Sequence, residues 1–319
     1  MQKIPVLPAA IAVLGLITVG LAGCSLPGSD ACPRPLSSAS SVTDLVSVSD
    51  DLDAAAEPAV YTPFHTEGTA ISDVVVGEGN ALTTDEQLVV LDLEVVGGNT
   101  GETVYAGSLE PAFQLSQLGQ AIPAITDALE CATEGSRVVV ALAPGDIEPE
   151  TAAGMGLRED ESAVAVVDLR QVYLARANGA PVFTSGNGLP TVVLAPSGQP
   201  GIIIPDASVP TETTVQVLKR GDGPEVTGEV PVRVHYTGVT WAERTVFDSS
   251  WEAAPASLTL DGVVPGFAEA LEGQTVGSQV MVVIPPEDGY GDLAQGTIPA
   301  NSTLVFVIDI LGLDPAVEQ

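Results

Sequence analysis

Five short blocks towards the end of the chain gather aromatic rings around one carboxylate. They are V-H-Y-T-G (234–238), V-F-D-S-S (246–250), G-F-A-E-A-L (266–271), D-G-Y-G (288–291) and N-S-T-L-V-F (301–306). Aromatic residues make up only 4% of the chain, so these rings stand out from its composition. Rings, one acid and one phenol can exclude water from a bound segment and hydrogen-bond to it. His235 has no Ser or Cys at triad spacing, so general-base catalysis is not expected.

The elements around these blocks are predicted to be mostly strands. Residues 230–236 alternate with a period of two, which puts Tyr236 on a buried face and His235 on a solvated one. Residues 304–310 alternate in the same way. Between them, Pro265 can begin a short helix and Gly273 can end it. The prediction is an α+β fold in which an antiparallel sheet wraps around one short helix.

The order and spacing of the five blocks resemble the FKBP family, the macrolide-binding peptidyl-prolyl isomerases. The resemblance runs from about Gly221 to Leu313 and therefore covers one domain. Taken singly, Tyr236, Phe267 and Phe306 fit an ordinary core, and Asp248 fits a turn. Taken together, the blocks indicate the family. It implies a half-barrel fold and catalysis of rotation about X-Pro amides, without any cofactor or metal.

The resemblance also implies a set of site residues. Phe267 would form the floor of a proline pocket, Asp248 would lie at its wall, and Tyr290 would donate its hydroxyl to a substrate carbonyl. The backbone N–H of Val264 would donate to another substrate carbonyl, and Ile298 would lie on a loop that overhangs the pocket. The predicted lining residues of the pocket are Tyr236, Phe247, Val263, Val264 and Phe306.

Two departures from the family bear on inhibitor binding. Many relatives carry Trp where this chain has Phe267, and an aromatic wall where it has Ala256. Both changes remove apolar contact area. We therefore expect macrolide inhibitors to bind more weakly than to relatives with the full set of rings, by about 1–3 kcal/mol.

The chain also contains two similar stretches of sequence. A-I-P-A-I-T-D-A-L-E (121–130) matches V-V-P-G-F-A-E-A-L-E (263–272), and G-S-R-V-V-V-A-L-A-P (135–144) matches G-S-Q-V-M-V-V-I-P-P (277–286), both at an offset of 142 residues. This regularity predicts an internal duplication. The expected organisation is a first FKBP-like domain at 58–176, a linker at 177–188, a catalytic domain at 189–313 and a tail at 314–319.

The first domain is predicted to be degenerate. Its counterparts of Asp248, Phe267 and Tyr290 are Ala106, Ile125 and Met155. Tyr105 does match Phe247, but the strand at 88–96 has no tyrosine to match Tyr236. Because the polar groups are missing, no isomerase activity is expected from residues 58–176, and binding of a polypeptide or packing against the second domain is the expected role.

The N-terminus is predicted to be a targeting segment. Lys3 precedes an uncharged apolar run at 4–21, which ends in L-A-G-C at 21–24. This ending resembles the lipobox of bacterial lipoproteins, which implies a signal peptide at 1–23 and a lipid on Cys24 at the outer face of the cytoplasmic membrane. Prolines in the run argue against a membrane-spanning helix. Residues 24–57 are expected to be a flexible tether.

Two cysteines remain after Cys24. In an oxidising compartment Cys32 and Cys131 could form a disulfide that ties the tail to the first domain, or they could be two unreactive thiols. The two histidines, His65 and His235, do not form a metal motif with them. The net charge of −32 argues against nucleic-acid binding, because such a surface repels phosphates.

Two functions are weighed. The first is a lipid-anchored prolyl isomerase that acts on proline-containing exported polypeptides. The second is a chaperone or adaptor lipoprotein that binds chains without catalysis. Asp248, Phe247 and Tyr290 favour the first, and the degenerate first domain favours some contribution from the second. A transporter's substrate-binding lipoprotein is disfavoured, because alternating strands and helices are lacking.

Overall fold

A computed structural model of the chain describes residues 32, 34, 45–183 and 188–315. All described residues belong to one compact unit. The predicted signal peptide and Cys24 lie outside the described residues. None of the described helices is long and apolar enough to cross a membrane.

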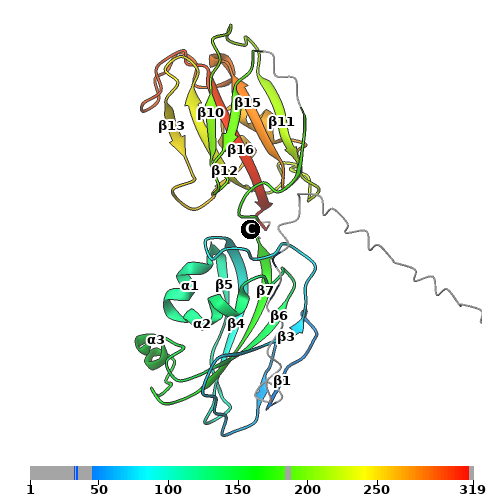
Figure 1. Cartoon of the computed structure of the whole chain (residues 1–319), viewed down its shortest axis with the longest axis vertical. Coiled ribbons are helices and arrows are strands. Elements are labelled where there is room, and N and C mark those ends of the chain that lie inside the picture. The colour runs from blue at the N-terminus through cyan, green and yellow to red at the C-terminus, as the bar shows by residue number, and fades with distance from the viewer. Residues whose placement is uncertain (1–31, 33, 35–44, 184–187, 316–319) are drawn as a thin grey trace, which may run out of the picture. The chain divides into compact units, whose positions relative to one another are not determined.

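The first sheet has five strands, and its neighbours are all antiparallel (Figure 1). In spatial order they are β3 (Ala70–Val75), β6 (Arg137–Leu142), β7 (Ala163–Val172), β4 (Leu88–Gly97) and β5 (Thr103–Gln114). Its helices are α1 (Leu115–Ala121), α2 (Pro123–Leu129) and α3 (Pro149–Gly154). The sequence predicted one short helix here, matching α2. Helices α1 and α3 were not predicted.

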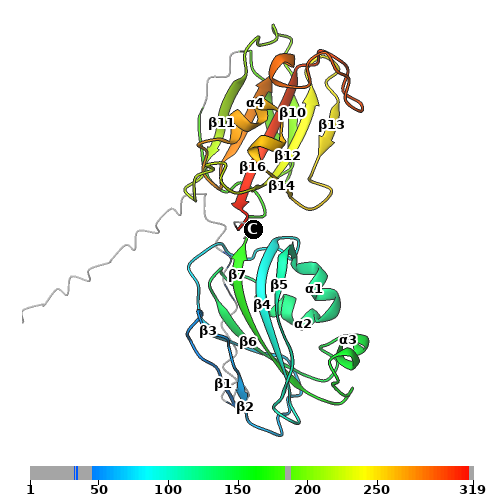
Figure 2. The ribbon, with the colours of Figure 1, turned by 180° about the vertical axis from the view of Figure 1, so that it is seen from behind.

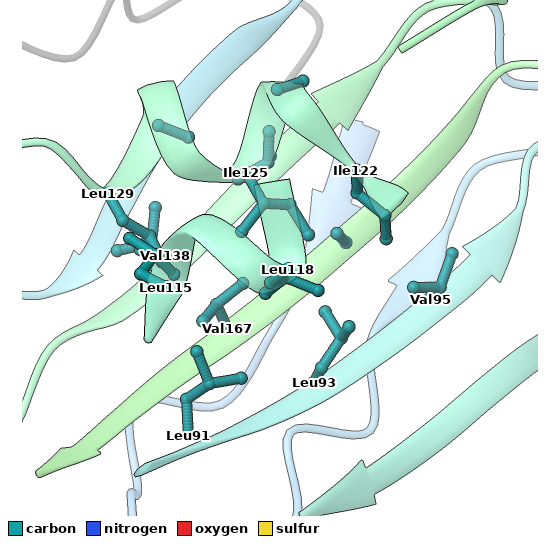
Figure 3. Packing of buried hydrophobic residues seen from close by; sticks show 14 of the residues in the cluster. Leu91, Leu93, Val95, Leu115, Leu118, Ile122, Ile125, Leu129, Val138 and Val167 are labelled. Atoms are coloured by element: carbon teal, nitrogen blue, oxygen red, sulfur yellow. The ribbon is translucent and has the colours of Figure 1, made fainter. Parts of the chain in front are cut away.

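Helices α1 and α2 supply the apolar layer over one face of this sheet. Figure 3 shows Leu118, Ile122 and Ile125 directed at strand residues that include Leu93 and Val167. Ile125 is fully buried. The pattern follows from helical spacing, since residues three and four apart share a face.

The second sheet has seven strands and the same central order as the first. Its strands are β13 (Val246–Ser249), β12 (Val232–Thr240), β16 (Leu304–Leu313), β15 (Gln279–Ile284), β11 (Thr214–Arg220) and β8 (Ala180–Pro181), with β14 (Ala256–Leu258) also paired to β12. Helical segments are η2 (Leu260–Gly262), α4 (Pro265–Leu271) and η3 (Pro286–Asp288). Helix α4 lies over this sheet in the view of Figure 2. It buries Phe267, Ala270 and Leu271, as the sequence predicted.

The two sheets share a local hydrogen-bond network. The N–H of Gly77 donates to Ser136 Oγ at 2.9 Å, and the N–H of Gly221 donates to Ser278 Oγ at 2.9 Å. Thr133 and Thr275 then donate to the carbonyls of the same two glycines, at 2.6 and 2.7 Å. Each pair of matching positions is separated by 142 or 144 residues in the sequence. The same serine and threonine hydrogen bonds therefore occur beside both sheets.

Part of the predicted tether is ordered. Strand β1 (Val46–Ser47) pairs with β2 (Ala59–Val60), and Val46, Val48 and Ala56 join a core cluster of the first sheet. Arg137 holds this segment by donating to the carbonyls of Ser49, Asp51 and Ala54. The expectation of flexibility is therefore wrong for residues 45–57, because a buried cation satisfies their carbonyls and apolar side chains cover the sheet.

A disulfide joins Cys32 to Cys131, with the two Cα atoms 5.3 Å apart. Next to it Arg34 forms an ion pair with Asp73 and donates to the carbonyl of Glu130 at 2.9 Å. Cys131 has a φ of 59°, and its counterpart at the same offset is Gly273, with a φ of 75°. The cysteine thus occupies a left-handed position that the second sheet gives to glycine.

The outer face of the second sheet is covered. The hairpin of β9 (Thr191–Leu194) and β10 (Pro200–Ile203) contributes to an apolar cluster with Trp241, Val305 and Val307. Strand β16 is consequently buried on both faces along nearly its whole length. Residues 180–181, placed in the linker by the sequence, form β8 and pair with β11.

Candidate active site

Four rings form an aromatic cluster in the second sheet: Tyr236, Phe247, Phe267 and Phe306. They come from β12, β13, α4 and β16 respectively. Phe306 is central, because its ring centroid lies 5.0 Å from Phe267, 5.4 Å from Phe247 and 6.1 Å from Tyr236. All these contacts are edge-to-face, a favoured arrangement of aromatic pairs. Phe267 and Phe306 are buried, whereas Tyr236 and Phe247 are half-buried.

One carboxylate borders the aromatic cluster. The hydroxyl of Tyr236 donates to Asp248 Oδ2 at 2.6 Å. Burial of the phenol, followed by its hydrogen bond to Asp248, raises the pKa of Tyr236. Tyr236 therefore stays protonated, and its proton fixes one oxygen of Asp248. Asp248 is itself exposed.

The remaining predicted apolar residues pack with the same core. Val263, Val264 and Ile298 belong to the cluster that contains Phe267 and Phe306. Val264 is the residue before helix α4, and its carbonyl accepts from the N–H of Phe267 at 2.9 Å. Pro265 follows it as the first helical residue, where a missing N–H has no cost. The sequence thus fixes the helix start that sets the position of Phe267.

Tyr290 lies on the loop between η3 and β16 and is 36% exposed. It is close enough to Tyr236 to contribute to that residue's raised pKa. The loop is held at two points. Thr213 donates to Asp288 Oδ2 at 2.6 Å, and Gln295 forms an isolated bridge with Ile298. Thr213 carries no signal in the sequence, since it lies outside all five blocks.

Gly238 was not identified as a site residue by the sequence reasoning, although it ends the first block. A Cβ at this position would lie 2.6 Å from Phe247 Cζ and 2.7 Å from Phe306 Cε1. The two rings occupy the space that any side chain would need. The glycine in V-H-Y-T-G was the available signal, because glycine within a strand marks a close approach.

The prediction that His235 faces solvent is wrong. His235 is 9% exposed, stacks on Trp251 with ring centroids 4.5 Å apart, and its Nδ1 lies 2.9 Å from Ser250 Oγ. Burial lowers the pKa of His235 to about 4. Alternation put His235 on the opposite face from Tyr236, but residues 250–251 cover that face. His235 remains neutral near pH 7.

The first sheet has no such cluster at the matching positions. In β12, Tyr236 pairs with Ile308 and Gly238 with Phe306; in β4, Leu93 pairs with Val167 and Val95 with Ala165. Val282 pairs with Phe306 in the second sheet, and Val140 pairs with Ala165 in the first. By this register, Leu93 is the counterpart of Tyr236, and Ala165 is the counterpart of Phe306. Met155 is half-buried and packs against the first core.

Comparison with known proteins identifies the family. The family model described as FKBP-type peptidyl-prolyl cis-trans isomerase matches residues 223–311. A probable FK506-binding protein of Corynebacterium glutamicum is 34% identical over 114 residues, which cover 35% of this chain and 97% of that protein. The FKBP-type isomerase FkpA of Escherichia coli is 39% identical over 107 residues, which cover 33% of this chain but only 39% of FkpA.

Among solved structures, the crystal structure of FkpA from Escherichia coli has a TM-score of 0.32 and 32% sequence identity, covering 42% of this chain and 54% of that chain. The residues matched by the family model include the aromatic cluster and Asp248. The chain belongs to the family of FKBP-type peptidyl-prolyl cis-trans isomerases.

Proposed function

We propose that the isomerase activity resides in the second sheet, at the aromatic cluster and Asp248. The observation that carries this proposal is the 2.6 Å hydrogen bond from Tyr236 to Asp248 at the border of four packed rings. The first sheet has no carboxylate at the place of Asp248, which is Ala106 by the sequence offset of 142 and Tyr105 by the strand register.

The proposed chemistry is rotation about an X-Pro amide. Its barrier is about 18–20 kcal/mol, because rotation breaks the partial double bond between carbon and nitrogen. No covalent bond forms or breaks. The twisted amide loses conjugation, so its carbonyl is less polar than in the planar form. Rings that exclude water remove solvation from the planar form and so favour the twisted one.

Each residue then has a defined role. Phe267 and Phe306 form the apolar surface for the proline ring, with Val263 and Ile298 at its border. The backbone N–H of Val264 and the hydroxyl of Tyr290 donate to carbonyls that flank the proline. Asp248, fixed by Tyr236, lies beside the rotating carbonyl. Hydrogen bonds of this kind orient the substrate and do not take part in proton transfer.

A protease-free assay of X-Pro isomerisation tests this assignment on the chain from residue 25 onward. We expect acceleration by the wild type and a loss in Asp248→Ala and Tyr290→Phe. Acceleration that survives in both variants would move the site elsewhere. A folded wild type that does not accelerate isomerisation at all would favour the second function, a polypeptide-binding chaperone or adaptor.

We also propose that the first sheet is a degenerate copy of the second and is inactive. The shared strand order and the shared Ser and Thr supports favour duplication. Leu93, Ala106, Ile125 and Ala165 stand where the second sheet has rings and a carboxylate. The role proposed for this half is binding of a polypeptide or packing against the second domain.

The proposed location is the outer face of the cytoplasmic membrane, through a lipid on Cys24, with proline-containing exported polypeptides as clients. The L-A-G-C ending at 21–24 and the disulfide between Cys32 and Cys131 support an exported protein. Metabolic labelling with a fatty acid tests the anchor. We expect label on the wild type and none on Cys24→Ala, which would leave the membrane fraction.

Macrolide inhibitors are proposed to bind the same cluster weakly. Ala256 is half-buried beside the core, and Phe267 offers less area than an indole. A titration against relatives with the full set of rings tests this, and an equal affinity would contradict it.

A further inference from the structure

We propose that Ser250 is a positioning residue of the isomerase site, which sets the backbone under Tyr236 and thereby the Tyr236–Asp248 pair. The proposal rests on the proposed function of the second sheet. The sequence reasoning treated Ser250 only as part of the V-F-D-S-S block.

Ser250 lies where the strand that carries Asp248 leaves its neighbour. Strand β13 pairs with β12 as far as Ser249, opposite Thr237, and β14 resumes the pairing at Ala256, opposite Val234. His235 and Tyr236 therefore have no strand partner on this side. A backbone N–H left unpaired under a half-buried ring would cost free energy.

The side chain of Ser250 replaces the missing strand partner. The N–H of Tyr236 donates to Ser250 Oγ at 2.9 Å, and the N–H of Ser250 donates to the carbonyl of Tyr236 at 3.1 Å. The carbonyl of Tyr236 also accepts from Ser249 Oγ at 3.3 Å, and Ser250 bonds both polar groups of the Tyr236 backbone. Ser250 is two positions from Asp248, to which the Tyr236 hydroxyl donates.

The hydroxyl of Ser250 has a second partner that fixes its direction. Its Oγ lies 2.9 Å from His235 Nδ1. Neutral His235 can accept a hydrogen bond from the serine hydroxyl, while the serine oxygen accepts one from the N–H of Tyr236. Trp251 stacks on His235, and Ser250 is only 8% exposed. Water is therefore excluded from taking over the role of the hydroxyl.

The first sheet lacks this arrangement. Strand β5 runs without a break from Thr103 to Gln114, and Leu93 there has a strand partner in Gly107. Gly107 therefore occupies the place of Ser250 in the strand register, and it has no side chain. Ser108, which the sequence offset of 142 aligns with Ser250, is exposed and donates to Glu110. The buried serine accompanies the sheet that has the Tyr–Asp pair and is absent from the sheet that does not.

The test measures kcat/KM for X-Pro isomerisation by the chain from residue 25 onward. We expect Ser250→Ala to lower kcat/KM by about tenfold, as for a buried hydrogen bond left unmade. Ser250→Thr, which keeps the hydroxyl, should restore most of it. In an Asp248→Ala background, Ser250→Ala should lower the residual rate by less than about twofold, because coupled residues are not additive.

Ser278→Ala is the matched control. It removes a bond of the same length, from Gly221 N–H to a buried serine, between elements that do not carry the cluster. We expect it to lower the melting temperature while kcat/KM stays unchanged. If Ser250→Ala does not fold, Ser250→Cys, which keeps the volume and a weak acceptor, takes its place.

Three results would overturn the proposal. They are a Ser250→Ala variant as active as the wild type, a loss of activity that Ser278→Ala reproduces, and a tenfold loss that persists without Asp248. An inactive wild type would instead overturn the proposed function, so the two failures are distinguishable.

Discussion

The two sheets have the same strand order but different interiors at matching positions. In the second, Tyr236, Phe247, Phe267 and Phe306 contact one another beside Asp248. In the first, the strand register puts Leu93 and Ala165 in the places of Tyr236 and Phe306. The sequence offset of 142 puts Tyr105 and Ile125 in the places of Phe247 and Phe267. The bonds of Ser136 and Ser278 are kept in both. The two sheets thus keep the same strand order with different side chains at these positions, and we expect the proposed site to depend on the particular side chains of the second sheet.

A second difference is the buried polar pair that joins β6 to β7 in the first sheet and β15 to β16 in the second. Arg137 forms a buried ion pair with Asp168 at 2.6 Å, whereas Gln279 donates to buried Asp309 at 2.6 Å. Burial raises the pKa of Asp309, while the hydrogen bond to Asp168 raises that of Arg137. The Arg137 guanidinium in the first sheet also donates to the backbone carbonyls of Ser49, Asp51 and Ala54.

The largest expected effect comes from replacing Phe306 with alanine, the residue type at its counterpart Ala165 in the first sheet. Phe306→Ala removes a ring that contacts three others, so the unfolding free energy should fall by about 3–5 kcal/mol. Isomerase activity should fall at least about tenfold, as loss of 1.4 kcal/mol of transition-state binding suffices for that. Urea unfolding and the protease-free assay measure the two.

Val305→Ala is the control for Phe306→Ala, because Val305 is equally buried but packs in the cluster on the other face of the sheet. It should lose stability and keep activity. Equal loss of activity in both variants would show that the rings act only as core.

Arg137→Gln replaces the Arg137–Asp168 ion pair of the first sheet with a glutamine–aspartate pair like Gln279–Asp309 of the second. It leaves Asp168 buried without its cation and frees the carbonyls of residues 49–54. We expect a loss of about 3–5 kcal/mol in unfolding free energy. Adding Asp168→Asn should recover part of that loss, and isomerase activity should not change. A neutral effect of Arg137→Gln would mean that the buried pair does not support the segment.

Protonation of His235 gives a pH dependence that the first sheet should lack, since Asp92 stands at its place. The unfolded chain binds a proton below a pKa of 6.5, but folded His235 does so only below about 4. Stability should therefore fall as pH decreases from 6.5 to 4, by roughly 3 kcal/mol. The measurement is unfolding free energy against pH.

His235→Gln should remove this part of the pH dependence. The difference between wild type and variant isolates it from the carboxylates that titrate in the same range. A constant difference across that range would contradict the buried neutral histidine.

The smallest expected effect concerns the left-handed position after α2. Cys131→Ser and Cys131→Gly both remove the disulfide. The glycine variant, which copies Gly273, should be more stable by about 1 kcal/mol, because a side chain at a φ of 59° is strained. Thermal unfolding of the two variants without reductant measures this difference, and equal stability would contradict it.

The sequence by itself determined what depends on short-range order. Pro265 and the spacing of Phe267, Ala270 and Leu271 predicted helix α4, and the five blocks predicted the family. The repeated offset predicted which residues of the first half replace Asp248 and Phe267. Each of these rests on local geometry, in which proline, helical period and motif spacing act within a few residues.

Tertiary structure decided what depends on contacts between distant segments. Alternation could not show that Trp251 covers His235, that the β9–β10 hairpin covers the outer face of β16, or that Arg137 orders residues 45–57. Nor could it show Ser250 under Tyr236 or both rings against Gly238. The period of a strand says which side chains share a face, but only packing decides what lies against that face.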